Sequence, residues 1–200
     1  MFPVSDVIPS RTTPVVTIGL IVAGAVAFIA GARLEAGEAP LQGPVLLSPL
    51  LHAGWLHLAG NTLSLWIFGD NVESALGRAA YLLFFAVASL IGAAAHGLVS
   101  GVTLPPPGAG APIAAVLGTY FVLYPRSRVL LAVFAMGSLD LIEIPALYIL
   151  GVWVLVQALA MLTAPGMVPV GVTVFAPHAA ALAFGGLVGL WLRRRVRWRE

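Results

Sequence analysis

The residues of this 200-residue chain whose chemistry stands out are four histidines and an asparagine that lie in or beside long apolar stretches. His57 and Asn61 are four residues apart, so a helix would place both side chains on one face. Polar groups at membrane depth are costly enough to require a role. The spacing leaves two roles open: hydrogen bonding between packed helices, or binding of a polar ligand group.

The other histidines do not suggest a metal centre. A site built from His52, His57 and His178 is disfavoured, because residues five apart point roughly 140° away from each other on a helix. No carboxylate accompanies them in the apolar stretches. We therefore expect no metal and no cofactor, with His52 as a hydrogen-bonded support and His96 as a packing or interfacial residue. A conduit for a small polar solute remains an alternative.

The composition places these residues in an integral membrane protein. Hydrophobic residues make up 60% of the chain, charged residues only 9%, and the mean hydropathy is +1.01. Such a chain has too little polar surface to cover a water-soluble globule of this length. Cysteine is absent, which excludes disulfides, thiolate metal sites and a cysteine nucleophile.

The apolar stretches predict an all-α protein with six transmembrane helices. The fourth stretch is too short to cross a bilayer alone, so the other helices should surround it. Two apolar connections, Arg33–Leu51 and Val129–Ile144, are expected to lie at the membrane interface. The six predicted helices are Pro14–Ala32, Gly54–Gly69, Ala79–Gly101, Ala111–Tyr124, Pro145–Thr163 and Val174–Leu192.

Arginine sets the predicted orientation, because the chain contains no lysine. With both termini in the cytoplasm, nine of the ten arginines fall inside and only Arg33 falls outside. The predicted parts are a cytoplasmic segment over 1–13, a membrane domain over 14–192 and a basic cytoplasmic tail over 193–200. The tail suits anionic lipid headgroups better than a protein or nucleic-acid partner. The inside arginines are Arg11, Arg78, Arg126, Arg128, Arg193, Arg194, Arg195, Arg197 and Arg199.

Three segments resemble the rhomboid family of intramembrane serine proteases, the peptidase S54 superfamily. The run Gly-Trp-Leu-His-Leu-Ala-Gly-Asn over 54–61, followed by Phe-Gly-Asp-Asn-Val-Glu over 68–73, resembles the family's second helix. Gly-Ala-Gly-Ala over 108–111 resembles its Gly-Ala-Ser-Gly segment at the start of a short fourth helix, and His178 matches its last catalytic position. The resemblance covers Leu46 to Leu190 and implies a six-helix rhomboid bundle.

The resemblance also assigns roles to individual residues. His57 and Asn61 take the positions that bind the oxyanion, and His178 takes the position of the general base. Gly110 takes the position of the nucleophilic serine, and no serine or threonine occurs between Leu104 and Gly118. The loss of that side chain is expected to enlarge the pocket at Gly110. Further departures from the family pattern are Ala111, Pro112 and the three alanines 179–181.

These features favour a catalytically inactive rhomboid-like protein that binds transmembrane segments of client proteins. The alternative is an active rhomboid endopeptidase that cleaves single-span membrane proteins with another nucleophile. The expected partners are the lipid bilayer and client segments, with no nucleic acid. The expected location is the cytoplasmic membrane of a bacterium.

Overall fold

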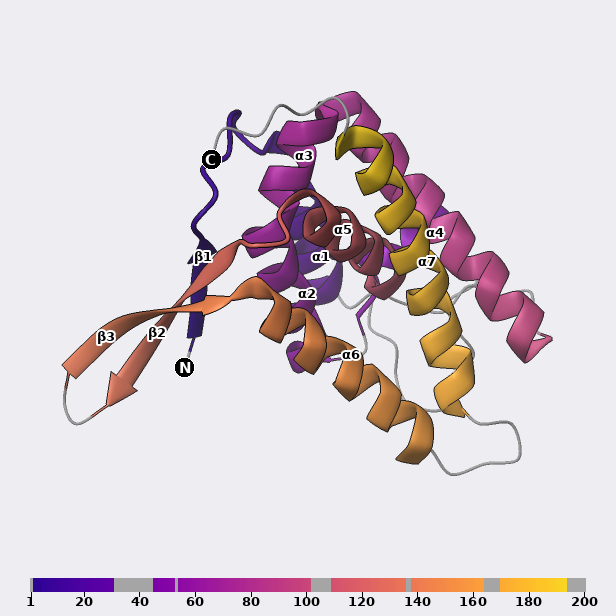
Figure 1. Cartoon of the computed structure of the whole chain (residues 1–200). Helices are drawn as coiled ribbons and strands as arrows, with labels where there is room; N and C mark the ends of the chain where they lie inside the picture. Colours follow the sequence, from indigo (N-terminus) through magenta and orange to yellow (C-terminus); the bar gives the residue numbers. More distant parts are fainter. Residues whose placement is uncertain are drawn as a thin grey trace.

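The computed structural model describes residues 2–30, 45–52, 54–101, 109–135, 138–163 and 170–193. Arg33, Gly108, most of the connection Arg33–Leu51 and the tail beyond Arg193 lie outside the described residues. Helices at all six predicted positions dominate the described part of the chain (Figure 1).

The helices follow the apolar stretches of the sequence closely. The first is α1 (Val15–Ile29), and a short 3₁₀ turn follows at Val45–Leu50. The second predicted helix consists of α2 (Trp55–Ser64), a π-helical turn (Leu65–Gly69) and α3 (Asp70–Leu76) in direct succession. The remaining helices are α4 (Arg78–Ser100), α5 (Gly110–Leu123), α6 (Ala146–Thr163) and α7 (Val170–Arg193).

Two of these helices are long and apolar enough to cross a membrane by themselves. They are α4 and the part of α7 from Phe175 to Arg193. The segments Val15–Ile29, Gly110–Leu123 and Ala146–Val156 are apolar but shorter. Six membrane crossings therefore remain a prediction.

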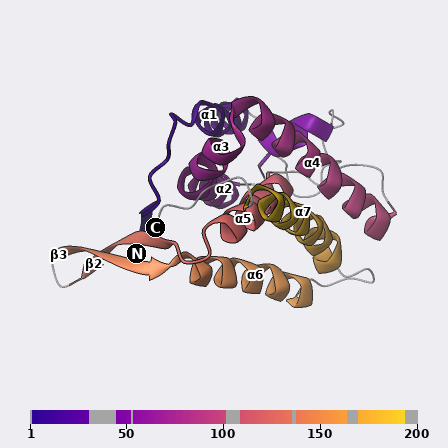
Figure 2. The same ribbon diagram turned by 45° about the horizontal axis from the view of Figure 1, so that its top comes forward.

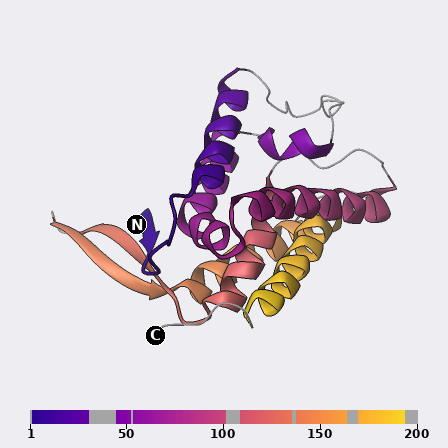
Figure 3. The same ribbon diagram turned by 90° about the horizontal axis from the view of Figure 1, so that it is seen from above.

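The structure corrects the prediction of an all-α protein. A three-stranded antiparallel sheet in the order β1-β2-β3 is formed by β1 (Phe2–Asp6), β2 (Arg128–Ala135) and β3 (Ser138–Pro145). The connection predicted to be interfacial thus forms a β-hairpin, because its apolar residues are interrupted by polar ones about every second or third position in β3. The hairpin projects away from the helices (Figures 1 and 3).

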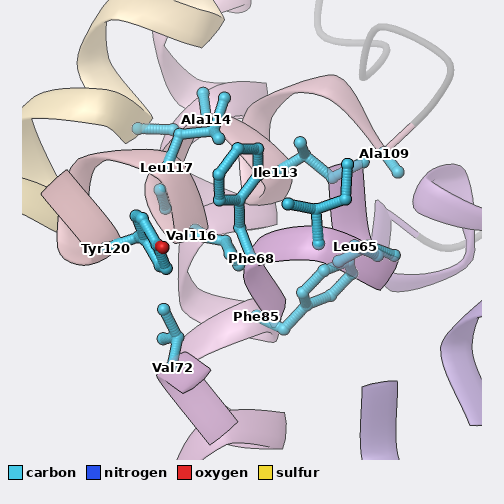
Figure 4. Close-up of a cluster of buried hydrophobic side chains, with 14 of the residues drawn as sticks. Leu65, Phe68, Val72, Phe85, Ala109, Ile113, Ala114, Val116, Leu117 and Tyr120 are labelled. Atoms are coloured by element: carbon cyan, nitrogen blue, oxygen red, sulfur yellow. The ribbon is translucent and has the colours of Figure 1, made fainter. Parts of the chain in front are cut away.

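The short helix α5 occupies the centre of the fold. Its residues from Ala111 to Tyr120 are all buried, in line with the prediction of a short central helix. The π-helical turn packs against it, with the rings of Phe68 and Tyr120 4.8 Å apart in an edge-to-face contact (Figure 4). Helix α7 lies along the same helix between α4 and α6 (Figure 2).

Glycines allow α5 and α7 to touch backbone to backbone. A Cβ atom at Gly185 would lie 1.9 Å from the carbonyl oxygen of Ala115, and one at Gly118 would lie 2.3 Å from that of Leu182. Thr119 adds a hydrogen bond, as its hydroxyl donates to the Gly185 carbonyl at 2.8 Å. Small residues that bring helix backbones this close are typical of membrane helix pairs.

Buried acidic groups fasten the end of the bundle that carries Arg78 and Arg126. The Glu73 carboxylate accepts hydrogen bonds from the backbone N–H groups of Val16 (3.0 Å) and Thr17 (2.7 Å) and thereby caps α1. The Asp6 carboxylate of β1 accepts hydrogen bonds from the Tyr120 hydroxyl and, at 2.8 Å, from Asn71 Nδ2. The N-terminal strand is therefore attached to α5 and α3.

Candidate active-site remnant

His57 and Asn61 lie one turn apart near the start of α2, as their spacing predicts. Gly54 precedes the helix with extended backbone angles, and Leu58 points into the core between the two polar residues. His57 and Asn61 are half-buried, whereas their neighbours Trp55 and Leu56 are exposed on the outer side. The helix therefore directs its polar face inward and exposes its apolar face on the outside of the fold.

Asn61 faces a small cavity with an unsatisfied donor. Its Nδ2 atom is buried and has no hydrogen-bond partner. The cavity is lined by Asn61 and His52, by Leu50 and Pro49 of the 3₁₀ turn, by Ala109 and by side chains of α1 and α4, and it has room for about one water molecule. A buried amide N–H without a partner costs roughly 1–3 kcal/mol, so this donor is free to bind an oxygen atom that enters the cavity.

Three histidines come together beside this cavity. The rings of His52 and His57 are 5.3 Å apart in an edge-to-face arrangement, and His57 also interacts electrostatically with His178. The predicted supporting role of His52 fits its surroundings, because its Nδ1 atom lies 3.1 Å from the Leu50 carbonyl oxygen. The structure thus gathers the polar residues that the sequence analysis singled out, apart from His96 on α4.

The ring of His178 lies in the space that a side chain at position 110 would take. A Cβ atom built on Gly110 would lie 2.2 Å from His178 Nε2 and 3.1 Å from both adjacent ring carbons. Side-chain carbons essentially never approach another heavy atom within 3.0 Å, so the imidazole occupies the space that a side chain at 110 would need. The expectation of an enlarged pocket at Gly110 is therefore wrong, because the ring fills that space.

The start of α5 is compatible with the proline at 112. The helix begins at Gly110, and the first intrahelical bond runs from Ile113 N–H to the Ala109 carbonyl at 2.9 Å. Pro112 stands in the first turn, where its missing N–H would have no partner within the helix. In α7, Pro177 precedes His178 directly and removes one backbone hydrogen bond at that point.

The hydroxyl groups nearest to the site in sequence have other partners. Thr119 lies two turns along α5 and donates to the Gly185 carbonyl, as noted above. Ser100 at the end of α4 donates to the His96 carbonyl at 2.8 Å. Within the described ranges, no set of three His, Cys, Asp or Glu side chains has an arrangement that would hold a metal ion.

The sequence analysis missed two contributors to this site. The ring of Trp153 on α6 meets the His178 ring edge to face, with 5.7 Å between the ring centroids. Gly92 of α4 lets Ala111 approach closely, since a Cβ atom there would lie 2.4 Å from the Ala111 Cβ. A tryptophan in an apolar helix and a glycine among other glycines carry no signal that distinguishes them from ordinary packing residues.

Comparison with known proteins gives a family match over most of the chain. A family model described as the Rhomboid domain matches residues 44–195. The chain is 44% identical over 48 residues to YdcA, a rhomboid-family protein of Bacillus subtilis strain 168, an alignment that covers 24% of each protein. It is 45% identical over 67 residues to the rhomboid protease GluP of the same strain, which covers 33% of this chain and 12% of GluP. The chain therefore aligns with a quarter or less of each curated relative.

Proposed function

Because the chain belongs to the rhomboid family of membrane-embedded, protease-like proteins, we propose that it is a pseudoprotease. In this proposal it binds transmembrane segments of client membrane proteins and does not cut them. The family resemblance assigns Gly110 to the position of the nucleophilic serine and His178 to that of the general base. Loss of the nucleophile costs about a million-fold in rate in a serine protease.

The observation that carries the proposal is the contact between Gly110 and His178. An imidazole that rests against a Cα atom, 2.2 Å from the place of a Cβ atom, has no hydroxyl to deprotonate at that position. Thr119 is buried between α5 and α7 and is occupied by the Gly185 carbonyl, so it is a poor substitute nucleophile. The absence of serine and threonine from Leu104 to Gly118 supports the same conclusion.

The polar face of α2 supports client binding. Asn61 offers an unsatisfied N–H donor at a cavity, and His57 stands one turn away on the same face. A transmembrane segment that is locally unwound exposes backbone carbonyl oxygens, which need donors inside a membrane. In this proposal the residues assigned to oxyanion binding hold such carbonyl groups in the ground state.

Photo-crosslinking in liposomes tests the binding. A photoreactive amino acid at Leu50, a half-buried residue that lines the cavity together with Asn61, should capture a co-reconstituted single-span protein with a helix-breaking segment. The control position is Leu98 on α4, which is 88% exposed and does not line the cavity. His57→Leu should lower the yield of crosslinks from position 50 severalfold and leave the yield from position 98 unchanged. Equal capture at both positions, insensitive to His57→Leu, would remove the basis for a binding role of this face.

Mass spectrometry of the same liposomes tests the absence of cleavage. The reporter should remain intact, and serine-directed fluorophosphonate probes should not label the chain. A cleavage product that disappears in His178→Ala would establish the alternative, an active endopeptidase, and overturn the proposal.

A further inference from the structure

The β2–β3 hairpin carries an apolar face that no other described element covers. Directly paired residues of antiparallel strands point to the same face of a sheet. Phe134 pairs with Leu139 and Ala132 pairs with Leu141, so these four side chains form one face, which we call the outer face. Phe134 is 74% exposed, Leu139 67% and Leu141 64%.

The opposite, inner face changes character along the hairpin. Near the helices it is buried, because Val129 and Leu131 belong to the hydrophobic core. Beyond the reach of β1, the inner face carries the exposed residues Ser138 and Asp140, which pair with Ala135 and Val133. In this part of the hairpin the large exposed apolar side chains therefore lie on the outer face and the polar side chains lie on the inner face.

The strand that carries half of the outer face leads directly into α6. Strand β3 ends at Pro145 and α6 begins at Ala146, so the chain passes from one to the other without a loop (Figure 1). The first exposed side chains of α6 are the large residues Leu147 and Tyr148, and Val152 follows one turn later. A belt of exposed apolar side chains on a membrane-embedded helix contacts lipid.

Charged side chains lie at the base of the hairpin. Arg128 and Glu143 pair on the outer face with 3.5 Å between Nη1 and Oε2, and Arg126 lies two residues before the hairpin. Arginines near the ends of membrane helices lie among the headgroups, and amphipathic segments at this level insert their apolar side into the acyl boundary. The hairpin projects beyond the helices (Figure 3).

We propose that the outer face of the hairpin tip lies against the bilayer, at the membrane interface where the arginine-bearing ends of the helices emerge. Phe134, Leu139 and Leu141 contact lipid, and Asp140 points to water. A second copy of the chain is the less favoured occupant, because α6, which follows the hairpin directly, also exposes large apolar side chains, and in a member of a membrane-embedded family lipid reaches both surfaces without any further partner.

The cysteine-free chain allows this proposal to be tested with single cysteines. Leu139→Cys and Asp140→Cys, neighbours on opposite faces, are labelled with an environment-sensitive fluorophore in the full chain, reconstituted at one molecule per nanodisc. Nitroxide lipids, spin-labelled near the headgroup, should quench the label at 139 severalfold more than the label at 140. Aqueous iodide should show the reverse preference. Leu98→Cys on α4 provides the lipid-facing reference, and Phe134→Cys repeats the outer-face measurement should the variant at 139 unfold.

Two outcomes overturn the proposal. Equal iodide quenching at positions 139 and 140, with lipid quenching seen only at 98, would place the outer face in water. Protection at 139 without lipid quenching, or protection that appears only with two molecules per nanodisc, would assign the face to a second copy of the chain.

Discussion

Replacing Gly110 by alanine probes the contact between α5 and His178 with a single methyl group. That methyl would lie 2.2 Å from His178 Nε2, so the imidazole has to retreat by roughly 1 Å. A retreat of the ring would disturb its edge-to-face contact with Trp153, and close backbone contacts hold α7 against α5.

The expected cost follows from overpacking. Forcing an extra methyl into a packed site costs about 1–3 kcal/mol, while the higher helix propensity of alanine offsets at most about 1 kcal/mol. If His178 is the obstacle, His178→Ala removes the clash, and Gly110→Ala then becomes neutral or slightly stabilising. The coupling free energy between the two positions should therefore be about 1–3 kcal/mol.

The assay is reversible unfolding in mixed micelles, followed by circular dichroism, for the wild type, both single variants and the double variant. Gly19→Ala in α1 is the matched control, because a Cβ atom there meets nothing within 4 Å. This control should have the same small effect with and without the His178 ring. If Gly110→Ala changes the free energy of unfolding equally in both backgrounds, the imidazole does not fill the space at 110 and the reasoning fails.

Three further variants test other parts of the fold by the same unfolding measurement. Gly185→Ala should lower the free energy of unfolding by about 3 kcal/mol or more, because its Cβ would lie 1.9 Å from the backbone oxygen of Ala115. The neighbouring control Gly186→Ala meets open space and should be neutral or stabilising. Equal effects of the two variants would contradict the backbone contact. Glu73→Gln should lower the free energy of unfolding by about 1.5–3 kcal/mol, because an amide NH₂ replaces a carboxylate oxygen that accepts hydrogen bonds from the first N–H groups of α1. An unchanged stability would refute the role of Glu73 as a cap of α1. Burial raises the pKa of Asp6 from 3.8 to about 6, so the folded chain retains a proton there that the unfolded chain releases, and stability should fall as the pH rises from about 4 to above 6. This pH dependence of the stability should be absent in Asp6→Asn. If it persisted in that variant, it would not arise from the burial of the Asp6 carboxyl group.

The helices were predictable because long apolar runs with few charges have one stable form in a membrane. The predicted starts at Gly54 and Ala111 lie within one residue of the helices at Trp55 and Gly110. The grouping of His57 with Asn61 followed from helical periodicity alone. The proximity of His178 required the family resemblance, since 117 residues separate it from Asn61.

The sheet and the state of the site were beyond the reach of the sequence argument. An apolar run of seven residues such as the one that follows Arg128 in β2 suits a strand and an interfacial helix equally well. The pairing of β1 with β2 depends on contacts between residues more than 120 positions apart. Only coordinates revealed that the imidazole of His178 has taken the space at Gly110. A missing side chain in a sequence leaves open whether the vacated volume stays empty or is filled by a neighbour.

The seam between α5 and α7 has a consequence for how a membrane segment can reach the site. Because the two backbones touch at Gly118 and Gly185, sliding or parting them would break packing along the whole seam. These helices therefore form a fixed frame that holds Gly110 and His178 at constant separation. Any opening toward the site must therefore come from a different helix. Helix α6 packs on the core with Ile149, Leu150 and Trp153, so its displacement would break these contacts and the ring contact with His178 while the α5–α7 frame stays whole. Movement of α6 thus changes which membrane segments have access to His178, while the packing of His178 against Gly110 stays the same.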